Sequence, residues 1–533
     1  MLRIESIKLP PGAGPAELAA ESARLLRVPE KDLLALRVVR RSVDARGDVQ
    51  MAYTVEAEVR DEASVLRRAR SRKISRALPA PAYVPPAPRP APPEPVVVAG
   101  AGPAGLFAAL VLAMAGQRPI LLERGRPVER RRADVERFWS TGELDPSSNV
   151  QFGEGGAGAF SDGKLNTGTK DLRHRFILET LVSCGARPDI LIDAKPHVGT
   201  DYLHIALVRL RQKLLDLGTD IRFESRLSDL EIQGGSLRGI TVEGPEGPYR
   251  IPCSRLLLCP GHSARDTFEM LRARGVVMEA KPFAVGVRIE HRQADCDAAQ
   301  YRQYAGHPGL PASTYKLSCH LPDGRAAYSF CVCPGGEVVA AASEEGRVVT
   351  NGMSEFARDR ENINGGLLVN VTPEDYGGTA DPLAGIAFQR NLEAAAFALG
   401  GGGYRAPAQR VEDFLARRPS TGPGRVLPSY RPGVTWADLH DCLPPFAADT
   451  IAAALPLLGR KLRGYDHPDA VLTAVESRSS SPVRIPRDAG CQSSLRGLYP
   501  CGEGAGYAGG ILSAAADGMR WAEHLMESMN KGV

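Results

Sequence analysis

The chain has 533 residues, and a usual domain size of about 150 residues predicts roughly three to four domains. Hydrophobic residues are 43% and charged residues 24% of the chain, which is ordinary for a globular protein and excludes wholesale disorder, collagen and coiled coil. The net charge of +4 falls short of that of a dedicated nucleic-acid binder, and ten mostly scattered cysteines do not indicate a disulfide framework. The first residues, MLRIESIKLP, lack the pattern of a signal peptide, so we expect a cytoplasmic enzyme.

Residues 1–77 predict a small α+β module, and residues 78–95 predict a linker. Alternating runs such as LRIESIKL and MAYTVEAEV flank a helical run, PAELAAESARLL, which favours ferredoxin-like topology. The linker contains nine prolines, so we expect an extended, semi-rigid spacer. The basic run RRARSRKISR at 67–76 favours a solvated helix face, with a docking patch for an acidic partner or nucleic acid as the alternative.

After the linker the sequence predicts a strand, a tight turn, a helix and a second strand. PVVVAG is short and uncharged, as in a buried parallel strand; AGLFAALVLAMAG is an apolar helix and RPILLERG is the next strand. The 23 residues from Pro95 to Gln117 carry no charge and are long enough to span a bilayer. Gly100, Gly102, Pro103 and Gly105 cluster in the first half of this stretch. They favour a strand, a turn and a helix instead of a membrane span.

The turn between this strand and helix carries the pattern GxGxxG at Gly100–Gly105. The first glycine allows the tight turn, the second lets the backbone approach a pyrophosphate, and the third lets helix and strand pack closely. The helix N-terminus offers free N–H groups to the phosphates. Glu123 ends the second strand 18 residues after Gly105, where its carboxylate would accept hydrogen bonds from ribose hydroxyls and repel the 2′-phosphate of NADP.

Three later segments favour FAD over NAD as the dinucleotide. Leu256–Gly261 is a strand ending in glycine, and Gly497–Glu503 is similar to the C-terminal signature of FAD proteins, with Glu503 where aspartate is usual. Gly509–Ile511 then opens a long helix whose N-terminus would face the N1/O2 edge of a flavin. Phe152–Leu165 is a glycine-rich loop that can lie close to the pyrophosphate and flavin ring, with a surface loop as the alternative.

The resulting candidate cofactor-binding residues are Gly100, Ala101, Gly102, Pro103, Ala104, Gly105, Glu123, Arg124, Gly155, Gly156, Ala157, Ser161, Lys164, Leu227, Gly261, Gly502, Glu503, Gly510 and Ile511. We expect no metal site.

Together these motifs resemble those of the bacterial family of FAD-dependent dehydrogenases, also called NAD(FAD)-utilising dehydrogenases. The segments that carry the resemblance are VQFGEGGAGAFSDGKLNTG, KPHVGTDYL, YSFCVCPGG, NGMS, ESRSSSPVRI and PCGEGAGYAGGILSAAADG. The resemblance covers nearly the whole chain and implies a two-domain FAD fold with a ferredoxin-like appendage, but no particular substrate.

The fold class expected is therefore α/β, with a glutathione-reductase-like FAD-binding Rossmann domain. Residues 96–280 and 476–533 would form that domain, and residues 281–475, with short strands, Gly/Pro turns and a helix near 446–462, would form an inserted α+β substrate domain.

His197, Arg288 and Arg478 are the candidates for catalysis. His197 precedes a helix that would border the flavin and is either a proton donor or oxyanion partner, or a structural histidine that caps the helix. Arg288 in VGVRIEH could hold a carboxylate or phosphate, although an exposed strand pair with His291 is the favoured alternative. Arg478 and Arg484 in ESRSSSPVR would bind substrate or pyrophosphate.

Cys331 and Cys333 form a CxC pair, which lacks the CxxC spacing of flavin disulfide reductases and would strain a disulfide ring. Buried strand and turn cysteines are therefore favoured over a redox or metal role. Cys501 lies inside the expected flavin signature, where packing is favoured over contact with the ring.

The sequence predicts an FAD-dependent oxidoreductase that transfers a hydride between flavin N5 and a small substrate. No second GxGxxG with a ribose acid is present, so NAD(P)H would visit only as a transient donor. The alternatives are an FAD-dependent RNA-modifying or RNA-binding protein, which the low net charge disfavours, and a flavoprotein fed by an electron-transfer partner. The sequence predicts no membrane association, and it leaves substrate and oligomeric state open.

Overall fold

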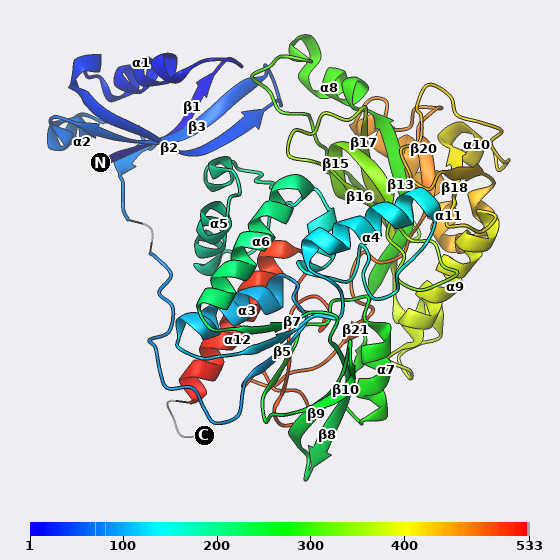
Figure 1. Ribbon diagram of the computed structural model, residues 1–533. Coiled ribbons are helices and arrows are strands. Elements are labelled where there is room, and N and C mark those ends of the chain that lie inside the picture. Colours follow the sequence, from blue (N-terminus) through cyan, green and yellow to red (C-terminus); the bar gives the residue numbers. More distant parts are fainter. Residues whose placement is uncertain (70, 80, 530–533) are drawn as a thin grey trace.

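The computed structural model describes residues 1–69, 71–79 and 81–529 of the chain (Figure 1). Arg70 of the basic run and Ala80 of the expected linker lie outside the described residues. The described chain contains an N-terminal module, a five-stranded parallel sheet and an eight-stranded sheet. Its short 3-10 helices are η1 (Glu30–Asp32), η2 (Gly156–Phe160), η3 (Pro188–Leu191), η4 (Arg302–Tyr304), η5 (Pro373–Tyr376) and η6 (Leu439–Asp441).

The N-terminal module has the element order β-α-β-β-α-β. Its elements are β1 (Leu2–Leu9), α1 (Pro15–Leu26), β2 (Leu33–Asp44), β3 (Gln50–Val59), α2 (Glu62–Arg68) and β4 (Ile74–Arg76). The antiparallel strand order β2-β3-β1-β4 is the ferredoxin-like topology that the sequence predicts. Alternate residues of β1, among them Leu2 and Ile4, are buried against Leu18 and Leu26 of α1, which gives the module its own core.

One arginine of β2 attaches this module to the rest of the protein. The Arg41 guanidinium donates to Asp193 Oδ1 at 2.8 Å and to Asp189 Oδ1 at 3.1 Å. The Arg41 N–H donates to Ile192 O, and the Ala194 N–H donates to Arg41 O. This short parallel bridge fixes the edge of the module's sheet next to η3.

The described residues of the proline-rich segment contain no helix or strand, as nine prolines predict. The segment is nevertheless seated on the protein. The ring centroids of Tyr83 and Phe176 are 4.9 Å apart, and the Arg89 N–H donates to Ala115 O at 2.9 Å. Contacts with α5 (Arg173–Ser183) and with the end of α3 (Pro103–Met114) therefore fix its path.

The five-stranded sheet is parallel and has the order β22-β11-β5-β6-β7. Its strands are β22 (Leu498–Pro500), β11 (Leu256–Leu258), β5 (Val97–Ala99), β6 (Ile120–Leu122) and β7 (Asp220–Arg222). Side chains alternate between its two faces. Val98 and Leu121 pack with α3, α6 (Thr200–Asp216) and α12 (Ile511–Ser528), whereas Val97 and Leu122 pack beneath the antiparallel strands β8 (Arg226–Gln233), β9 (Ser236–Gly244) and β10 (Gly247–Pro252).

The uncharged stretch from Pro95 to Gln117 is β5, a turn and α3, as the sequence predicts. Helix α3 is apolar all round because the sheet covers one side and α12 covers another. Among the described residues, no helix combines the length and the apolar character required to cross a membrane.

The larger sheet has the order β14-β15-β17-β13-β20-β18-β19, and β16 pairs with β15. Its strands are β13 (Phe283–Arg292), β14 (Ser318–His320), β15 (Ala326–Ala340), β16 (Thr350–Met353), β17 (Asn362–Val371), β18 (Ala406–Arg410), β19 (Val434–Trp436) and β20 (Val471–Glu476). The helices around it are α8 (Gln293–Tyr301), α9 (Ala384–Leu399), α10 (Val411–Leu415) and α11 (Pro445–Lys461), while α4 (Val128–Thr141) and α7 (Arg265–Ala273) belong to the preceding part. Strand β12 (Glu279–Ala280) pairs with β21 (Val483–Arg484) where the chain enters and leaves this sheet.

We predict that Gly518→Ala lowers stability because α3 and α12 touch at this glycine. A Cβ on Gly518 would lie 2.0 Å from Ala104 O, so the two helices would have to separate. Overpacking of this kind costs typically about 1–3 kcal/mol. Thermal unfolding followed by circular dichroism should give a lower midpoint for Gly518→Ala than for Gly422→Ala, which has open space around its Cβ. Equal midpoints would contradict the helix contact.

Candidate functional site

A cavity of about 390 Å³ lies at the carboxyl ends of the parallel strands. Gly100 and Gly102 follow β5, Glu123 follows β6, Gly261 follows β11 and Glu503 follows β22, and all five line the cavity. The chain order of the sheet reverses between β5 and β11, which is the position where open α/β sheets bind their ligands. The volume is within the range of small-molecule and cofactor sites, about 300–1,000 Å³.

Glycines and helix ends make this cavity suitable for an anionic dinucleotide. Within the described chain, a Cβ added to Gly102 would have no neighbouring atom closer than 4.0 Å, and one added to Gly261 or Gly510 would have none within 4 Å, so side chains there would fill the cavity. Helix α3 begins directly after Gly102 and α12 directly after Gly510, and neither has a side-chain cap. Two sets of free N–H groups therefore face the cavity, as phosphate binding requires.

The carboxylate of Glu123 joins three backbone segments around the cavity. Its Oε2 accepts from the Ala101 N–H, and its Oε1 accepts from the Gly125 and Gly153 N–H groups, with 2.9 Å between nitrogen and oxygen in each pair. A carboxylate has about four acceptor positions, so one on Oε2 remains for a ribose hydroxyl. Glu123 therefore both shapes the site and fits the predicted ribose contact.

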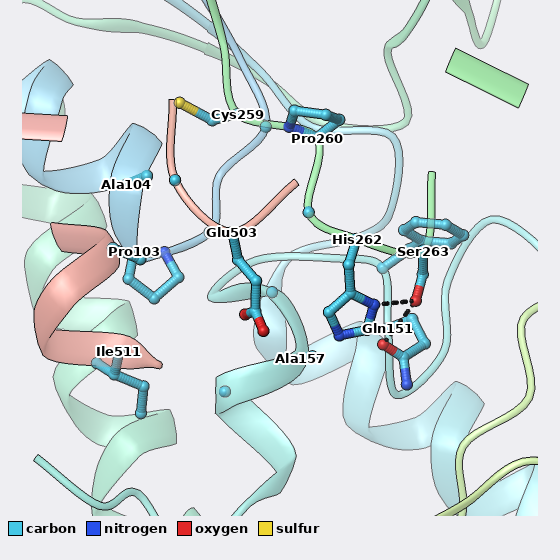
Figure 2. A pocket seen from close by; sticks show the side chains of 18 of the residues that line it. Pro103, Ala104, Gln151, Ala157, Cys259, Pro260, His262, Ser263, Glu503 and Ile511 are labelled. Carbon is cyan, nitrogen blue, oxygen red and sulfur yellow. Dashed lines mark hydrogen bonds between the residues drawn. The ribbon is translucent and has the colours of Figure 1, made fainter. Parts of the chain in front are cut away.

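Polar side chains from different loops also meet at the cavity. Figure 2 shows the Glu503 carboxylate and the His262 ring directed into the space that Pro103, Ile511 and Gln151 border. Ser263 Oγ donates to Gln151 Oε1 at 3.0 Å and lies 3.0 Å from His262 Nδ1. Burial lowers the pKa of His262 to about 3, with Arg478 and Arg265 adding to the effect, so this ring is neutral at pH 7. Burial raises the pKa of Glu503 to about 7.

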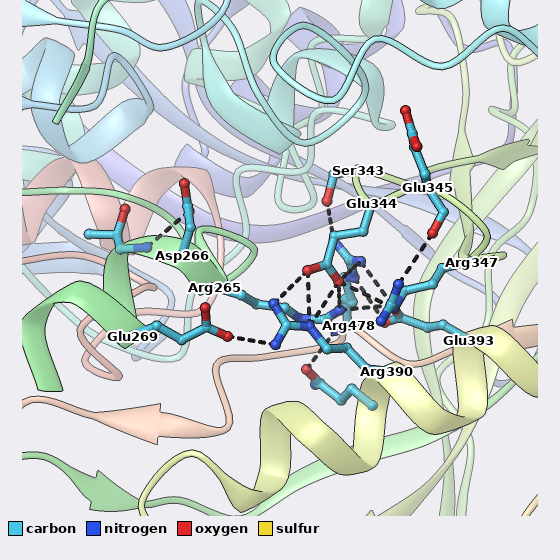
Figure 3. A network of polar contacts seen from close by, with 12 residues as sticks. Arg265, Asp266, Glu269, Ser343, Glu344, Glu345, Arg347, Arg390, Glu393 and Arg478 are labelled. Atoms are coloured by element: carbon cyan, nitrogen blue, oxygen red, sulfur yellow. Dashed lines mark hydrogen bonds and ion pairs between the residues drawn. The ribbon is translucent and has the colours of Figure 1, made fainter. Parts of the chain in front are cut away.

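A buried ion network lies behind Arg478, which is its one member on the cavity wall in the described chain (Figure 3). Glu393, which is 0% exposed, accepts from both Arg265 and Arg478, with Nη–Oε distances of 2.7–2.9 Å. Arg478 Nη1 also donates to Ser343 Oγ, and Arg265 pairs with Glu344. Burial alone would raise the pKa of Glu393, but the two guanidinium charges outweigh it and hold that pKa well below its usual range.

Most predicted cofactor residues line the cavity, namely Gly100, Gly102, Pro103, Ala104, Glu123, Arg124, Gly156, Ala157, Ser161, Lys164, Leu227, Gly261, Gly502, Glu503, Gly510 and Ile511. Ala101, Gly105 and Gly155 do not line it. Ala101 instead donates to Glu123, and the Gly155 N–H donates to Ala101 O at 2.8 Å. A Cβ on Gly105 would lie 1.9 Å from Gly100 O, so this glycine is required for the turn itself.

Of the three catalytic candidates, only Arg478 lines the cavity. His197 stacks on Phe356, with ring centroids 5.1 Å apart, and its Nε2 lies 3.1 Å from Phe356 O, so its ring is held away from the cavity. Arg288 is fully buried rather than exposed on its strand, and it donates to both oxygens of Glu476. The structure thus gives His197 and Arg288 positions behind the wall.

The sequence reasoning missed several wall residues, including His262, Gln151, Glu476 and Thr350. His262 follows Gly261 at the end of β11, so the strand-end rule could have found it. Glu476 belongs to the segment ESRSSSPVR, in which the sequence predicts binding residues only at the arginines. Cys331 and Cys501 line the cavity as well, although packing was the favoured interpretation for both.

Comparisons with known proteins agree with a flavin site. Residues 94–136 match the family profile described as FAD binding domain, residues 282–479 match FAD-dependent protein, C-terminal domain-like, and residues 1–60 match a domain of unknown function. A Clostridium beijerinckii protein named "Uncharacterized protein" is 44% identical over 533 residues, 99% of both chains. The 12-dehydrotetracycline 5-monooxygenase/anhydrotetracycline 6-monooxygenase of Streptomyces rimosus is 31% identical over 175 residues, 31% of this chain and 30% of that protein.

Among solved structures, a mutant of the E. coli quinol fumarate reductase has 14% identity and a TM-score of 0.38, covering 83% of this chain and 71% of that chain. The two family profiles, together with the fit of the cavity to a dinucleotide, identify the cofactor as FAD.

We predict that Glu123→Gln weakens FAD binding at least tenfold. The amide has one acceptor oxygen in place of two, so buried N–H groups lose their partner, at a cost of about 1–3 kcal/mol each. Titration of the apoprotein with FAD, followed by flavin fluorescence, measures the change. Glu94→Gln, an exposed glutamate just before β5, is the matched control and should bind FAD as the wild type does. Unchanged affinity in Glu123→Gln would contradict the role given to this carboxylate.

We predict that Glu393→Gln destabilises the protein by about 3–5 kcal/mol, because two buried guanidinium groups lose their counter-charge. The folded-state pKa of Glu393 is depressed, so its stabilisation is present above the unfolded carboxyl pKa of about 4.3 and is lost as the pH falls below it. Urea unfolding at pH 7 and pH 4 tests both statements. Substitution of the exposed Glu345 by Gln serves as the control. If Glu393→Gln lowers the free energy of unfolding no more than Glu345→Gln does, the ion network does not stabilise the protein.

Proposed function

The chain belongs to one family with its Clostridium beijerinckii relative and is an FAD-dependent oxidoreductase, and from this premise we propose that it transfers a hydride between FAD and a small organic substrate. Bound FAD supplies the hydride chemistry, while the protein orients the reactants and exchanges the proton. The N-terminus of α3 and Glu123 would hold the pyrophosphate and the ribose. Glu503 and the N-terminus of α12 would hold the ribityl chain and the edge of the flavin.

The position and the raised pKa of Glu476 are the main support for this proposal. Glu476 ends β20 in the larger sheet, lines the cavity and accepts two hydrogen bonds from Arg288 Nη1, at 3.2 and 3.0 Å. Burial raises the pKa of Glu476 to about 7, against the opposing charge of Arg288. A carboxyl group that titrates near pH 7 can give or take the proton that accompanies hydride transfer. Arg288 is then a positioning residue.

Thr350 offers a contact for the substrate. Thr350 lines the cavity from β16 and is 1% exposed, and its buried Oγ1 has no hydrogen-bond partner within the described parts of the chain. Buried polar atoms are normally paired, so a ligand oxygen is a suitable partner for this hydroxyl. Glu476 and Thr350 both belong to the larger sheet, which supports binding of the substrate between that sheet and the flavin.

The second candidate is a hydroxylase that inserts oxygen into its substrate. The similarity to the Streptomyces rimosus monooxygenase over 175 residues favours it, but that match covers only 31% of this chain. Cys331 lines the same cavity, and a thiol beside activated oxygen is prone to oxidation. We therefore favour hydride transfer.

Anaerobic titration of the FAD-loaded protein with NADH and then NADPH separates the two functions. We predict that the flavin absorbance near 450 nm, roughly where oxidised flavins absorb, bleaches with a nicotinamide donor and returns on adding an organic acceptor without oxygen. Reoxidation that occurs only with oxygen, with incorporation of labelled oxygen into a product, would instead establish the hydroxylase. Gly102→Leu, which cannot accommodate the pyrophosphate, is the flavin-free control.

A further inference from the structure

Strand β15 carries a bulge at the cavity. Phe330 pairs with Gly366 of β17 and Cys333 pairs with Asn364, so three residue steps on β15 face two on β17. Cys331 lies in the bulge with a φ of +39°, a conformation that is rare for residues other than glycine. Bulges redirect side chains and are common beside active sites. Here the bulge brings Cys331 to the wall of the FAD cavity.

The two cysteines of this bulge have different surroundings. Cys331 is half-buried and lines the cavity, whereas Cys333 is 0% exposed. The Cys333 thiol donates to Cys331 O at 3.4 Å, and its sulfur lies 3.8 Å from Arg288 Nη2. One sulfur can therefore reach a ligand in the cavity, and the other is held directly behind it.

Two cations lie beside these cysteines and hold the backbone of the bulge. Arg288 of β13 donates to Cys331 O at 2.9 Å, and Lys164 donates to Val332 O. The carboxylates that act on Cys331 from around the cavity, and oppose these cations, are Asp162, Glu476 and Glu503. The adjacent Cys333 thiol, with the charges of Lys164 and Arg288, lowers the pKa of Cys331 to about 5, and the same proximity raises the pKa of Cys333 well above its usual range.

We propose that Cys331 and Cys333 form a redox-active pair that exchanges two electrons with FAD and with a small disulfide substrate. The proposal deepens the proposed function, on which it rests, by naming a substrate class. In the reductive step, bound reduced FAD would supply a hydride equivalent to the Cys331–Cys333 disulfide and would itself be oxidised. The sulfur–sulfur bond would break, leaving Cys331 as a thiolate and Cys333 as a thiol.

The second step returns the pair to the disulfide. The Cys331 thiolate attacks one sulfur of the substrate disulfide, which releases one substrate thiolate and leaves a mixed disulfide. Cys333 then attacks Cys331, its proton passes to the second substrate sulfur, and a thiol leaves. The short spacing that strains a CxC disulfide is an advantage in this role, because strained disulfides are the easily reduced, catalytic ones.

Alkylation and mass spectrometry of the FAD-loaded protein test the pair without any activity assay. Iodoacetamide should modify Cys331 with half-maximal rate near pH 5, and Cys333→Ala should move this midpoint upward by removing the neighbouring thiol. Treatment with 2-hydroxyethyl disulfide should make the peptide that contains both cysteines lose two hydrogens and resist alkylation. Cys319→Ser, a buried cysteine of β14 outside the cavity, is the matched control and should change none of these results.

A midpoint near the ordinary thiol value of about 8.5, with no disulfide in the mass spectrum, would overturn the proposal. A second measurement separates it from the proposed function. Protein whose FAD has been reduced by light, without a nicotinamide donor, should regain its flavin band on anaerobic addition of 2-hydroxyethyl disulfide, and Cys331→Ser should not. If NADH bleaches the flavin but the disulfide does not restore the band, the redox pair fails while the hydride-transfer proposal stands.

Discussion

The Glu123 carboxylate is the interaction on which the cavity depends. It accepts three backbone N–H groups, one from the turn after β5, one from the loop after β6 and one from the glycine-rich loop near Gly153. These segments are far apart in the chain, and only a buried acceptor with several lone pairs can hold them together. The same group has one acceptor position left, on Oε2, and we propose that a ribose hydroxyl of FAD occupies it.

The larger sheet supplies the chemistry that the parallel sheet lacks. Glu476, Thr350 and Cys331 all come from its strands, while the parallel sheet contributes mainly glycines and helix ends. The buried Glu393 network holds the adjoining wall, because it connects Arg265 of α7 with Arg478 just after β20. In the proposed function, substrate chemistry and cofactor binding are thus divided between the two sheets, which both contribute to the cavity wall.

The parts of the site that sequence could predict are local. GxGxxG, Glu123 and Gly510 stand at fixed short distances from strand and helix ends, so their positions follow once those elements are recognised. Contacts that depend on distant pairing could not be predicted. Arg265 meets Glu393 across 128 residues, and His197 is turned away by Phe356, which lies 159 residues further on. The role of Cys331 depends on a one-residue bulge that no spacing in the sequence indicates.

The most direct test of the account is the crystal structure of the protein with FAD bound. We predict that the pyrophosphate lies over Gly102 at the start of α3, a ribose hydroxyl on Glu123 Oε2, and the flavin ring between the start of α12 and the strands that carry Glu476 and Cys331. A flavin ring directed away from these strands, or FAD bound outside this cavity, would contradict it.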